Sequence, residues 1–204
     1  MNNKVIWITG GSSGIGKALV KALLADGARV VIGDVEQEAL DKTLEDLGEL
    51  GELSGLITDV SDLSSIENLA DFVYQKYGVC HLLFNNAGVA APSANVWETT
   101  PNDWLWVHRV NVMGVVYGIQ TFIPRMIDGG EDGFIINTSS GDGGVSPLPY
   151  QSVYASSKAA VSCITECLSA QLQSAETKLG AAIFYPSGGL LDTGIWTTDR
   201  NRPL

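Results

Sequence analysis

Histidine, cysteine and basic residues are scarce in this chain of 204 residues. It has 2 histidines, 3 cysteines, and 12 lysines and arginines against 23 aspartates and glutamates, which gives a net charge of −11. This excess of negative charge argues against a nucleic-acid backbone as partner. The sequence has no apolar run long enough to cross a bilayer and no signal-peptide pattern at its start. We therefore expect no nucleic-acid partner, no membrane partner and a cytoplasmic location.

The cysteines argue for the same compartment. Cys80, Cys163 and Cys167 are odd in number and lack a disulfide pattern, which suits a reducing environment. Cys163 and Cys167 are four residues apart on a predicted helix, a spacing that metal sites also use. No histidine or acidic cluster accompanies them, so we interpret them as packing residues and expect no metal.

Strand and helix patterns alternate from end to end. This alternation predicts a doubly wound parallel α/β sheet with helices on both faces, in three layers, as one domain over residues 1–204. Ser61 and Thr100 are predicted helix N-caps, and Pro101 follows Thr100 as the first helical residue. Strands are predicted over 4–9, 29–34, 54–60, 81–84, 134–138 and 181–185, and helices over 13–26, 36–47, 61–77, 101–127 and 152–176.

A glycine-rich turn separates the first strand from the first helix. Backbone N–H groups in such a turn can face a pyrophosphate, and the helix N-terminus adds a favourable dipole. Gly10 is expected to allow the tight turn, Gly14 the close approach of a ligand, and Gly16 close helix packing. The turn therefore predicts a dinucleotide site formed by Gly10, Ser12, Ser13, Gly14, Ile15 and Gly16.

An aspartate ends the second predicted strand, eighteen residues after Gly16. A carboxylate at Asp34 can accept hydrogen bonds from both adenosine-ribose hydroxyls and would repel a 2′-phosphate. This favours NAD over NADP, although a solvated loop aspartate is the alternative interpretation. Asp59 and Val60, at the end of the third strand, are expected to flank the adenine.

A tyrosine and a lysine lie one helical turn apart near the C-terminal third. Tyr154 and Lys158 share a helix face because residues i and i+4 are stacked. A unit charge at ~4 Å with an effective dielectric constant of ~20 contributes roughly 4 kcal/mol, enough to lower the phenol pKa by up to about three units. Tyr154 would then titrate near working pH, as a general acid/base requires, and Lys158 is also expected to reach the nicotinamide ribose. Such a pair alone is common on helix surfaces; the glycine turn upstream favours the catalytic interpretation.

Two further polar positions fit the same site. Ser139 and Ser140 end the fifth predicted strand, at the edge where open α/β sheets bind ligands, and a hydroxyl there can donate to a substrate carbonyl oxygen. Asn111 stands among apolar residues of a predicted helix. Its side chain either holds a water that relays protons or is a buried, satisfied amide.

These motifs together resemble the short-chain dehydrogenase/reductase family, in its single-domain branch. The matching strings are Thr9 to Gly16, Asn85 to Gly88, and Tyr154 with Lys158. The resemblance implies a Rossmann fold and places a catalytic tetrad on Asn111, Ser140, Tyr154 and Lys158. It implies that Tyr154 is the general acid/base and that Lys158 lowers the pKa of Tyr154 and binds the ribose. It also implies that Ser140 polarises the substrate carbonyl and that Asn111 supports a proton relay. It also implies that Asn86, Ala87 and Gly88 lie beside the cofactor.

The chain departs from the family pattern in two places. Ser140 and Tyr154 are fourteen residues apart where thirteen is usual, so either Ser139 or Ser140 is catalytic, and we favour Ser140. After the sixth strand, Pro186 is not followed directly by glycine. Pro186, Gly188 and Thr193 are the expected cofactor contacts there, with Thr193 at the nicotinamide carboxamide.

The resemblance also sets the expected function. The chain ends before the last strand and helix typical of the family, so we expect a C-terminally incomplete domain. The resemblance implies an NAD-dependent oxidoreductase for secondary alcohols or ketones, assembled as a homodimer or homotetramer through the helices at 101–127 and 152–176. The apolar character of the residues expected to border the substrate favours an alicyclic, steroid-like or terpenoid body. A non-catalytic dinucleotide-binding sensor or scaffold is the alternative. Residues expected to border the substrate are Val89, Pro92, Val96, Trp97, Val145, Pro147, Leu148, Tyr150, Ile195 and Trp196.

Overall fold

Six parallel strands form one sheet at the centre of the molecule. The structure, a computed structural model, describes residues 1–186 and 193–202. The strand order is β3-β2-β1-β4-β5-β6, so the doubly wound arrangement predicted from the sequence is confirmed. The strands are β1 (Val5–Thr9), β2 (Arg29–Asp34), β3 (Leu53–Ile57), β4 (Leu82–Asn85), β5 (Gly133–Thr138) and β6 (Leu179–Phe184).

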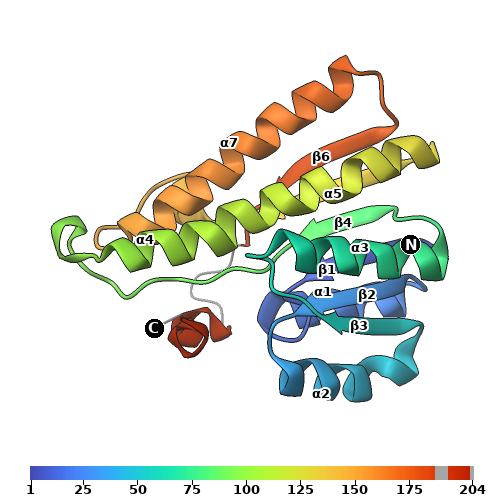
Figure 1. Cartoon of the computed structure of the whole chain (residues 1–204), viewed down its shortest axis with the longest axis horizontal. Coiled ribbons are helices and arrows are strands. Elements are labelled where there is room, and N and C mark those ends of the chain that lie inside the picture. Colours follow the sequence, from blue (N-terminus) through green and yellow to red (C-terminus); the bar gives the residue numbers. More distant parts are fainter. Residues whose placement is uncertain (187–192, 203–204) are drawn as a thin grey trace.

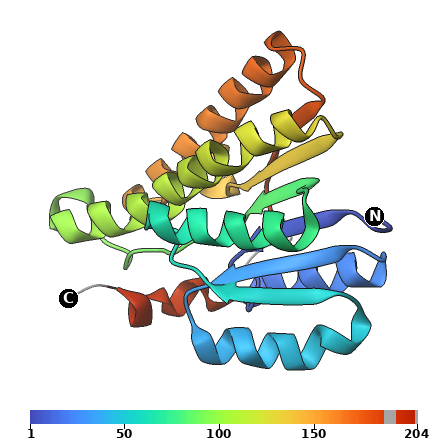
Figure 2. The ribbon, with the colours of Figure 1, turned by 45° about the vertical axis from the view of Figure 1, so that its right-hand side comes forward.

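Helices connect the strands and cover the two faces of the sheet, as Figures 1 and 2 show. The α-helices are α1 (Gly14–Ala25), α2 (Gln37–Leu47), α3 (Leu63–Tyr77), α4 (Pro101–His108), α5 (Gly114–Gly129), α6 (Gly141–Gly144) and α7 (Ser152–Ser174). Shorter turns are η1 (Gly48–Leu50), η2 (Val96–Glu98), η3 (Arg109–Met113) and η4 (Gly194–Asn201).

The sheet has a hydrophobic core on each face. Both Trp7 and its neighbour Ile8 are fully buried, because alternate residues of β1 point to opposite faces and both faces are covered. On one face α3, α5 and α7 pack together, and Trp7 stacks on Phe122 with ring centroids 4.2 Å apart. On the other face α1 and α2 pack over Ile8 and its neighbours, whereas Phe134 on β5 is 42% exposed.

The start of α4 was predicted correctly. Thr100 is its N-cap and Pro101 its first residue. The Thr100 hydroxyl accepts a hydrogen bond from the Asp103 backbone N–H at 3.3 Å, and the Asp103 carboxylate accepts one from the Thr100 N–H at 2.7 Å. This reciprocal capping box satisfies two backbone donors that the helix itself leaves unpaired.

The predicted N-cap at Ser61 is wrong by one residue. Asp62 caps α3 instead, with its carboxylate accepting from the Ser64 N–H at 3.1 Å. The Ser61 N–H donates to the Asp59 carboxylate at 2.8 Å, which closes a turn before the helix. The third strand is correspondingly shorter than predicted and ends at Ile57.

A single helix predicted over residues 101–127 is instead three consecutive pieces. A π-helical turn, Arg109–Met113, separates α4 from α5. A π turn widens the helix by one residue and is common at functional sites. Here its central residue is Asn111, which is 1% exposed.

The prediction that Cys163 and Cys167 are packing residues is wrong. Cys80 is buried, whereas Cys163 and Cys167 are exposed on α7. The buried side of α7 runs through Val161, Thr165 and Leu168, and the two cysteines follow a different helix face. Among the residues that the structure describes, none of the helices is both long and apolar enough to cross a membrane.

Candidate active site

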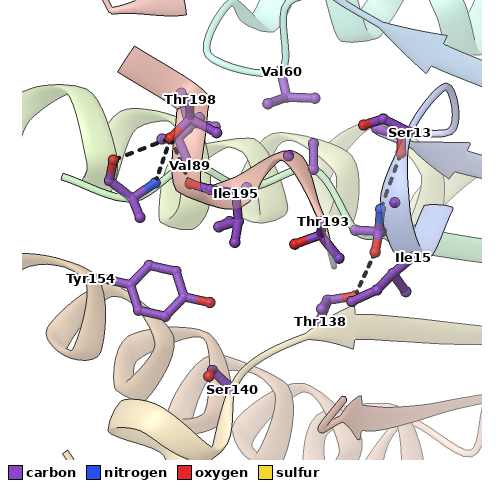
Figure 3. A pocket seen from close by; sticks show the side chains of 18 of the residues that line it. Ser13, Ile15, Val60, Val89, Thr138, Ser140, Tyr154, Thr193, Ile195 and Thr198 are labelled. Carbon is purple, nitrogen blue, oxygen red and sulfur yellow. Dashed lines mark hydrogen bonds between the residues drawn. The ribbon is translucent and has the colours of Figure 1, made fainter. Parts of the chain in front are cut away.

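The site lies where the strand order reverses. β1 and β4 are neighbours in the sheet, and ligands of open α/β sheets bind at the carboxyl ends of strands beside such a reversal. A pocket of about 640 Å³ opens there (Figure 3). The predicted residues that line it are Gly10, Ser13, Gly14, Ile15, Asp34, Asp59, Val60, Asn86, Ala87, Gly88, Ser140, Tyr154, Lys158, Pro186 and Thr193. Gly188 lies outside the described residues.

The glycines of the first turn are required by their surroundings. Gly10 and Gly14 have φ of +65° and +47°, in the left-handed region that favours glycine. A Cβ at Gly10 would lie 3.0 Å from the Ala87 Cα, and one at Gly14 would lie 3.1 Å from the Thr193 Cβ. A Cβ at Gly16 would overlap the carbonyl oxygen of Gly10. The turn therefore packs tightly against its neighbours, and Gly10, Ser13 and Gly14 line the pocket, which fits a pyrophosphate there.

Ser12 supports the turn from behind and does not line the pocket. It is 5% exposed, and its N–H donates to the Asp34 carboxylate at 3.1 Å. Its carbonyl oxygen accepts from the Thr43 hydroxyl at 3.0 Å. Asp34 also accepts from the Glu36 N–H at 3.2 Å, so its carboxylate ties the glycine turn to the end of β2.

The string that follows β4 is fixed to the end of β1. The Thr9 hydroxyl accepts from the N–H groups of Asn86 and Ala87 at 2.9 and 3.0 Å. The Asn86 amide donates to the Thr9 carbonyl oxygen at 3.1 Å. These bonds hold the two loops of the reversal point side by side, as an extended dinucleotide site requires.

Of the two serines after β5, Ser140 faces the pocket. Ser139 also lines the pocket, but it is 1% exposed and its hydroxyl donates to the Lys158 carbonyl oxygen at 2.8 Å. Ser140 lines the pocket, and its hydroxyl oxygen accepts from the Asp142 N–H at 3.1 Å. Because that bond uses a lone pair, the Ser140 O–H proton stays available to an oxygen in the pocket.

The phenol of Tyr154 points into the pocket near Ser140 (Figure 3). Its pKa is raised above the usual value, with burial as the largest cause. The hydrogen bond with Ser140 lowers this pKa and the charge of Asp142 raises it. The phenol pKa is therefore not lowered as the sequence led us to expect, because desolvation favours the neutral form.

Lys158 is more deeply buried than Tyr154. It is 3% exposed, its ammonium donates to the Thr138 carbonyl oxygen at 2.9 Å, and the nitrogen lies 5.6 Å from the centroid of the Tyr154 ring. Burial lowers its pKa to about 8. Gly88 makes room for it, since a Cβ at Gly88 would lie 3.3 Å from the ammonium nitrogen.

The side chain of Asn111 lies behind the pocket wall and is fully engaged as a donor. Its carbonyl oxygen accepts from the Val89 N–H at 2.8 Å. Its amide group donates to the Val89 carbonyl oxygen and to the Ser157 hydroxyl, each at 2.9 Å. Both amide protons are thus committed, so this side chain joins the π turn to the loop after β4 and to α7.

A segment near the end of the chain covers the pocket. Thr193 and Ile195 face it, and the Thr198 hydroxyl accepts from the Ala90 N–H at 3.1 Å (Figure 3). The Asn201 amide donates to the Glu36 carboxylate at 2.7 Å, and Arg202 forms an ion pair with Asp103 at 2.5 Å. These contacts attach the segment to both ends of the pocket.

Several pocket residues were not predicted. Asp142 and Gln151 lie two residues after Ser140 and three before Tyr154, so their nearness to these positions was a usable signal. No sequence signal placed other lining residues at the pocket, among them Glu36, Ser61, Trp106, Val110, Thr198 and Asn201.

The predicted substrate-bordering residues divide into four groups. Val89, Leu148 and Ile195 line the main pocket, and Pro92 lines a side cavity of about 120 Å³ next to it. The Trp196 side chain is outside the described part of the chain. The remaining five are exposed or partly exposed and line neither cavity: Val96, Trp97, Val145, Pro147 and Tyr150. Within residues 1–186 and 193–202, no group of three histidines, cysteines or acidic residues is arranged to hold a metal ion.

Comparisons with known protein sequences indicate one family. A sequence model of the short chain dehydrogenase family matches residues 4–201. The chain is 31% identical over 202 residues to a "CLA biosynthesis dehydrogenase/reductase" of Lactiplantibacillus plantarum, and the match covers 98% of this chain and 69% of that protein. In other relatives, such as the "Probable oxidoreductase EphD" of Mycobacterium tuberculosis, the chain spans only 32% of the length.

Solved structures lead to the same family. A short chain dehydrogenase/reductase from Burkholderia phymatum in complex with NAD has a TM-score of 0.94 and 39% identity, covering 99% of this chain and 71% of that one. A metagenomic short-chain oxidoreductase in complex with NADP has a TM-score of 0.84 and 28% identity, covering 92% and 83%. Motifs, strand order, pocket and these matches together show that the chain belongs to the short-chain dehydrogenase/reductase family of oxidoreductases.

Proposed function

We propose that this chain transfers a hydride between NAD and a secondary alcohol or ketone, with Tyr154 as the general acid/base. The observation that carries the proposal is the shared pocket of the Ser140 hydroxyl, the Tyr154 phenol and the glycine turn. A hydroxyl donor beside a proton-transferring phenol suits one oxygen atom whose charge changes during reaction.

Each polar group has a distinct task in this proposal. Ser140 donates its hydroxyl proton to the substrate oxygen, because its bond with the Asp142 N–H uses a lone pair of the hydroxyl and not the proton. Tyr154 gives a proton to that oxygen during ketone reduction and takes one during alcohol oxidation. Lys158 supplies positive charge 5.6 Å from the ring, and Asn111 positions the loop that starts at Val89.

The dinucleotide, when bound, accepts or supplies the hydride. Gly10, Gly14 and the N-terminus of α1 would hold its pyrophosphate. Asp34 and Glu36 line the end of the pocket beside β2 and offer acceptors for the adenosine ribose. Among the described residues that line the pocket, Lys158 is the sole lysine or arginine, so the described lining offers no cation beside Asp34 to receive a 2′-phosphate. This charge distribution supports NAD over NADP.

The walls near Tyr154 favour a largely apolar substrate body. Val89, Trp106, Val110 and Ile195 contribute aliphatic and aromatic surface there, with few polar groups between them. An alicyclic or steroid-like secondary alcohol is the substrate class we propose. Assembly as a homodimer or homotetramer through α4, α5 and α7, Thr193 as the carboxamide contact, and a cytoplasmic location remain predictions.

The test is NAD reduction measured by absorbance across a panel of secondary alcohols. Tyr154→Phe should abolish turnover and leave NADH binding nearly unchanged, because it removes only the proton-transferring oxygen. Tyr150→Phe is the matched control, since Tyr150 is 61% exposed and does not line the pocket, and it should keep full activity. Tight NADH binding without turnover of any alcohol by the wild type would favour the non-catalytic alternative.

A further inference from the structure

The pocket contains a carboxylate at its catalytic end. Asp142 lines the pocket two residues after Ser140. The other acidic side chains that line it, Asp34, Glu36 and Asp59, follow β2 and β3 at the opposite end, where the cofactor is proposed to bind. Asp142 is therefore placed to meet the substrate rather than the dinucleotide.

The loop around Asp142 is held in place from several sides. The Asp142 N–H donates to the Ser140 hydroxyl oxygen at 3.1 Å, and its carboxylate accepts from the Leu148 N–H at 2.7 Å. The next residue, Gly143, has φ of +92°, and a Cβ there would overlap the carbonyl oxygen of Ala155. Because Ala155 directly follows Tyr154, this close packing keeps Asp142 beside the phenol. A carboxylate fixed in this way loses little entropy on binding a ligand.

The charge of Asp142 is not neutralised locally. No lysine or arginine forms an ion pair with it in the part of the chain that the structure describes. Lys158, the basic residue at this end, is buried with its ammonium bound to the Thr138 carbonyl oxygen. The charge of Asp142 also affects the phenol of Tyr154. Burial is the largest cause of the raised pKa of Tyr154, the hydrogen bond with Ser140 lowers this pKa, and the charge of Asp142 raises it.

A carboxylate in this position discriminates between substrates by charge. One Asp142 oxygen accepts from Leu148, which leaves further lone pairs for a donor in the pocket. Hydrogen bonds to a charged acceptor are stronger than those between neutral groups. A second carboxylate brought alongside would instead be repelled.

We propose that Asp142 is a specificity-determining residue that selects substrates with a hydrogen-bond donor, a hydroxyl or an ammonium, next to the reacting carbon and rejects those with a carboxylate there. This inference rests on the proposed function and narrows its substrate class. The apolar walls bind the body of such a substrate, and Asp142 binds the donor beside the carbinol.

Four probes that share a phenyl carbinol test the proposal: 1-phenylethanol, 1-phenyl-1,2-ethanediol, 2-amino-1-phenylethanol and mandelate. They differ only in the neighbouring group, which is methyl, hydroxymethyl, ammoniomethyl or carboxylate. Their affinities for the NAD-loaded protein are measured by calorimetry at neutral pH, and kcat/KM for each is measured separately. The variants are Asp142→Asn, which keeps an acceptor for Leu148, and Asp128→Asn, which removes an exposed charge outside the pocket.

The wild type and Asp128→Asn should bind the amino alcohol and the diol more tightly than 1-phenylethanol, and mandelate least. In Asp142→Asn the ratio of amino-alcohol to mandelate affinity should fall by roughly tenfold or more, as expected for the loss of a charged acceptor. The proposal is overturned if no probe binds, if mandelate binds as well as the amino alcohol, or if Asp142→Asn leaves the ratio unchanged. The expected ranking in binding without any turnover would refute the proposed function and leave this inference standing.

Discussion

Replacing Asn111 by alanine separates a structural from a chemical role for this side chain. The substitution removes three hydrogen bonds of 2.8 to 2.9 Å and leaves the N–H and carbonyl groups of Val89 without partners. Ser157 keeps its bond to the Tyr154 carbonyl oxygen at 2.7 Å. Each buried, unsatisfied group costs about 1–3 kcal/mol, so two such groups should lower the free energy of unfolding by about 2–6 kcal/mol. This is a large part of the about 5–15 kcal/mol typical of folded proteins.

Urea unfolding followed by circular dichroism measures this loss. Asn111→Asp should also be strongly destabilising, since a carboxylate accepts from the Val89 N–H but cannot donate to the Val89 carbonyl oxygen. Asn2→Ala, at an exposed position, is the control and should change stability by less than about 0.5 kcal/mol. If Asn111→Ala unfolds like the wild type yet loses all turnover, the side chain acts in proton transfer and the structural account is wrong.

Three further predictions concern the glycine turn, the cofactor end and the phenol. Gly16→Ala should lower the free energy of unfolding by about 1–3 kcal/mol, because its Cβ would overlap the carbonyl oxygen of Gly10, and it should weaken NADH binding, measured by NADH fluorescence. Gly48→Ala, which has open space around it, should leave both unchanged or stabilise the protein slightly. Asp34→Asn should raise the affinity for NADP relative to NAD by roughly tenfold, the order expected when a like charge is removed, and an unchanged ratio in competitive titration would refute this. The raised pKa of Tyr154 keeps the phenol protonated at neutral pH in the free protein, so the tyrosinate absorbance of the wild type minus that of Tyr154→Phe should stay flat through neutral pH; a step there would contradict it.

The parts of the molecule that depend on local chemistry could be predicted from the sequence. The glycine turn has a spacing that only a tight strand-to-helix connection requires, and Thr100 with Pro101 marks a helix start through backbone geometry alone. The alternation of strands and helices was enough for the sheet and its doubly wound order. Ser140 was proposed from the end of a predicted strand, and Tyr154 with Lys158 from their spacing on a predicted helix.

Other features depend on packing that no local pattern encodes. The choice between Ser139 and Ser140 follows from the hydrogen bonds of their hydroxyls: Ser139 donates its proton to the Lys158 carbonyl oxygen on α7, whereas the bond of Ser140 with the Asp142 N–H leaves its proton unused. The raised pKa of Tyr154 depends on how tightly the loops and the segment after residue 193 cover it, so the charge of Lys158 alone gave the wrong direction. The π turn around Asn111 uses residues that suit an ordinary helix equally well, and the tertiary bonds of its amide set it apart.

Isotope transfer tests the central claim most directly. A secondary alcohol deuterated at the carbinol carbon, chosen from those turned over, is incubated with the protein and NAD, and the reduced dinucleotide is analysed by mass spectrometry. The account predicts one deuterium in each NADH formed by the wild type and no detectable NADH with Tyr154→Phe, although both proteins bind NADH. NADH without deuterium, or equal transfer by the Tyr154→Phe variant, would contradict hydride transfer with Tyr154 as the acid/base.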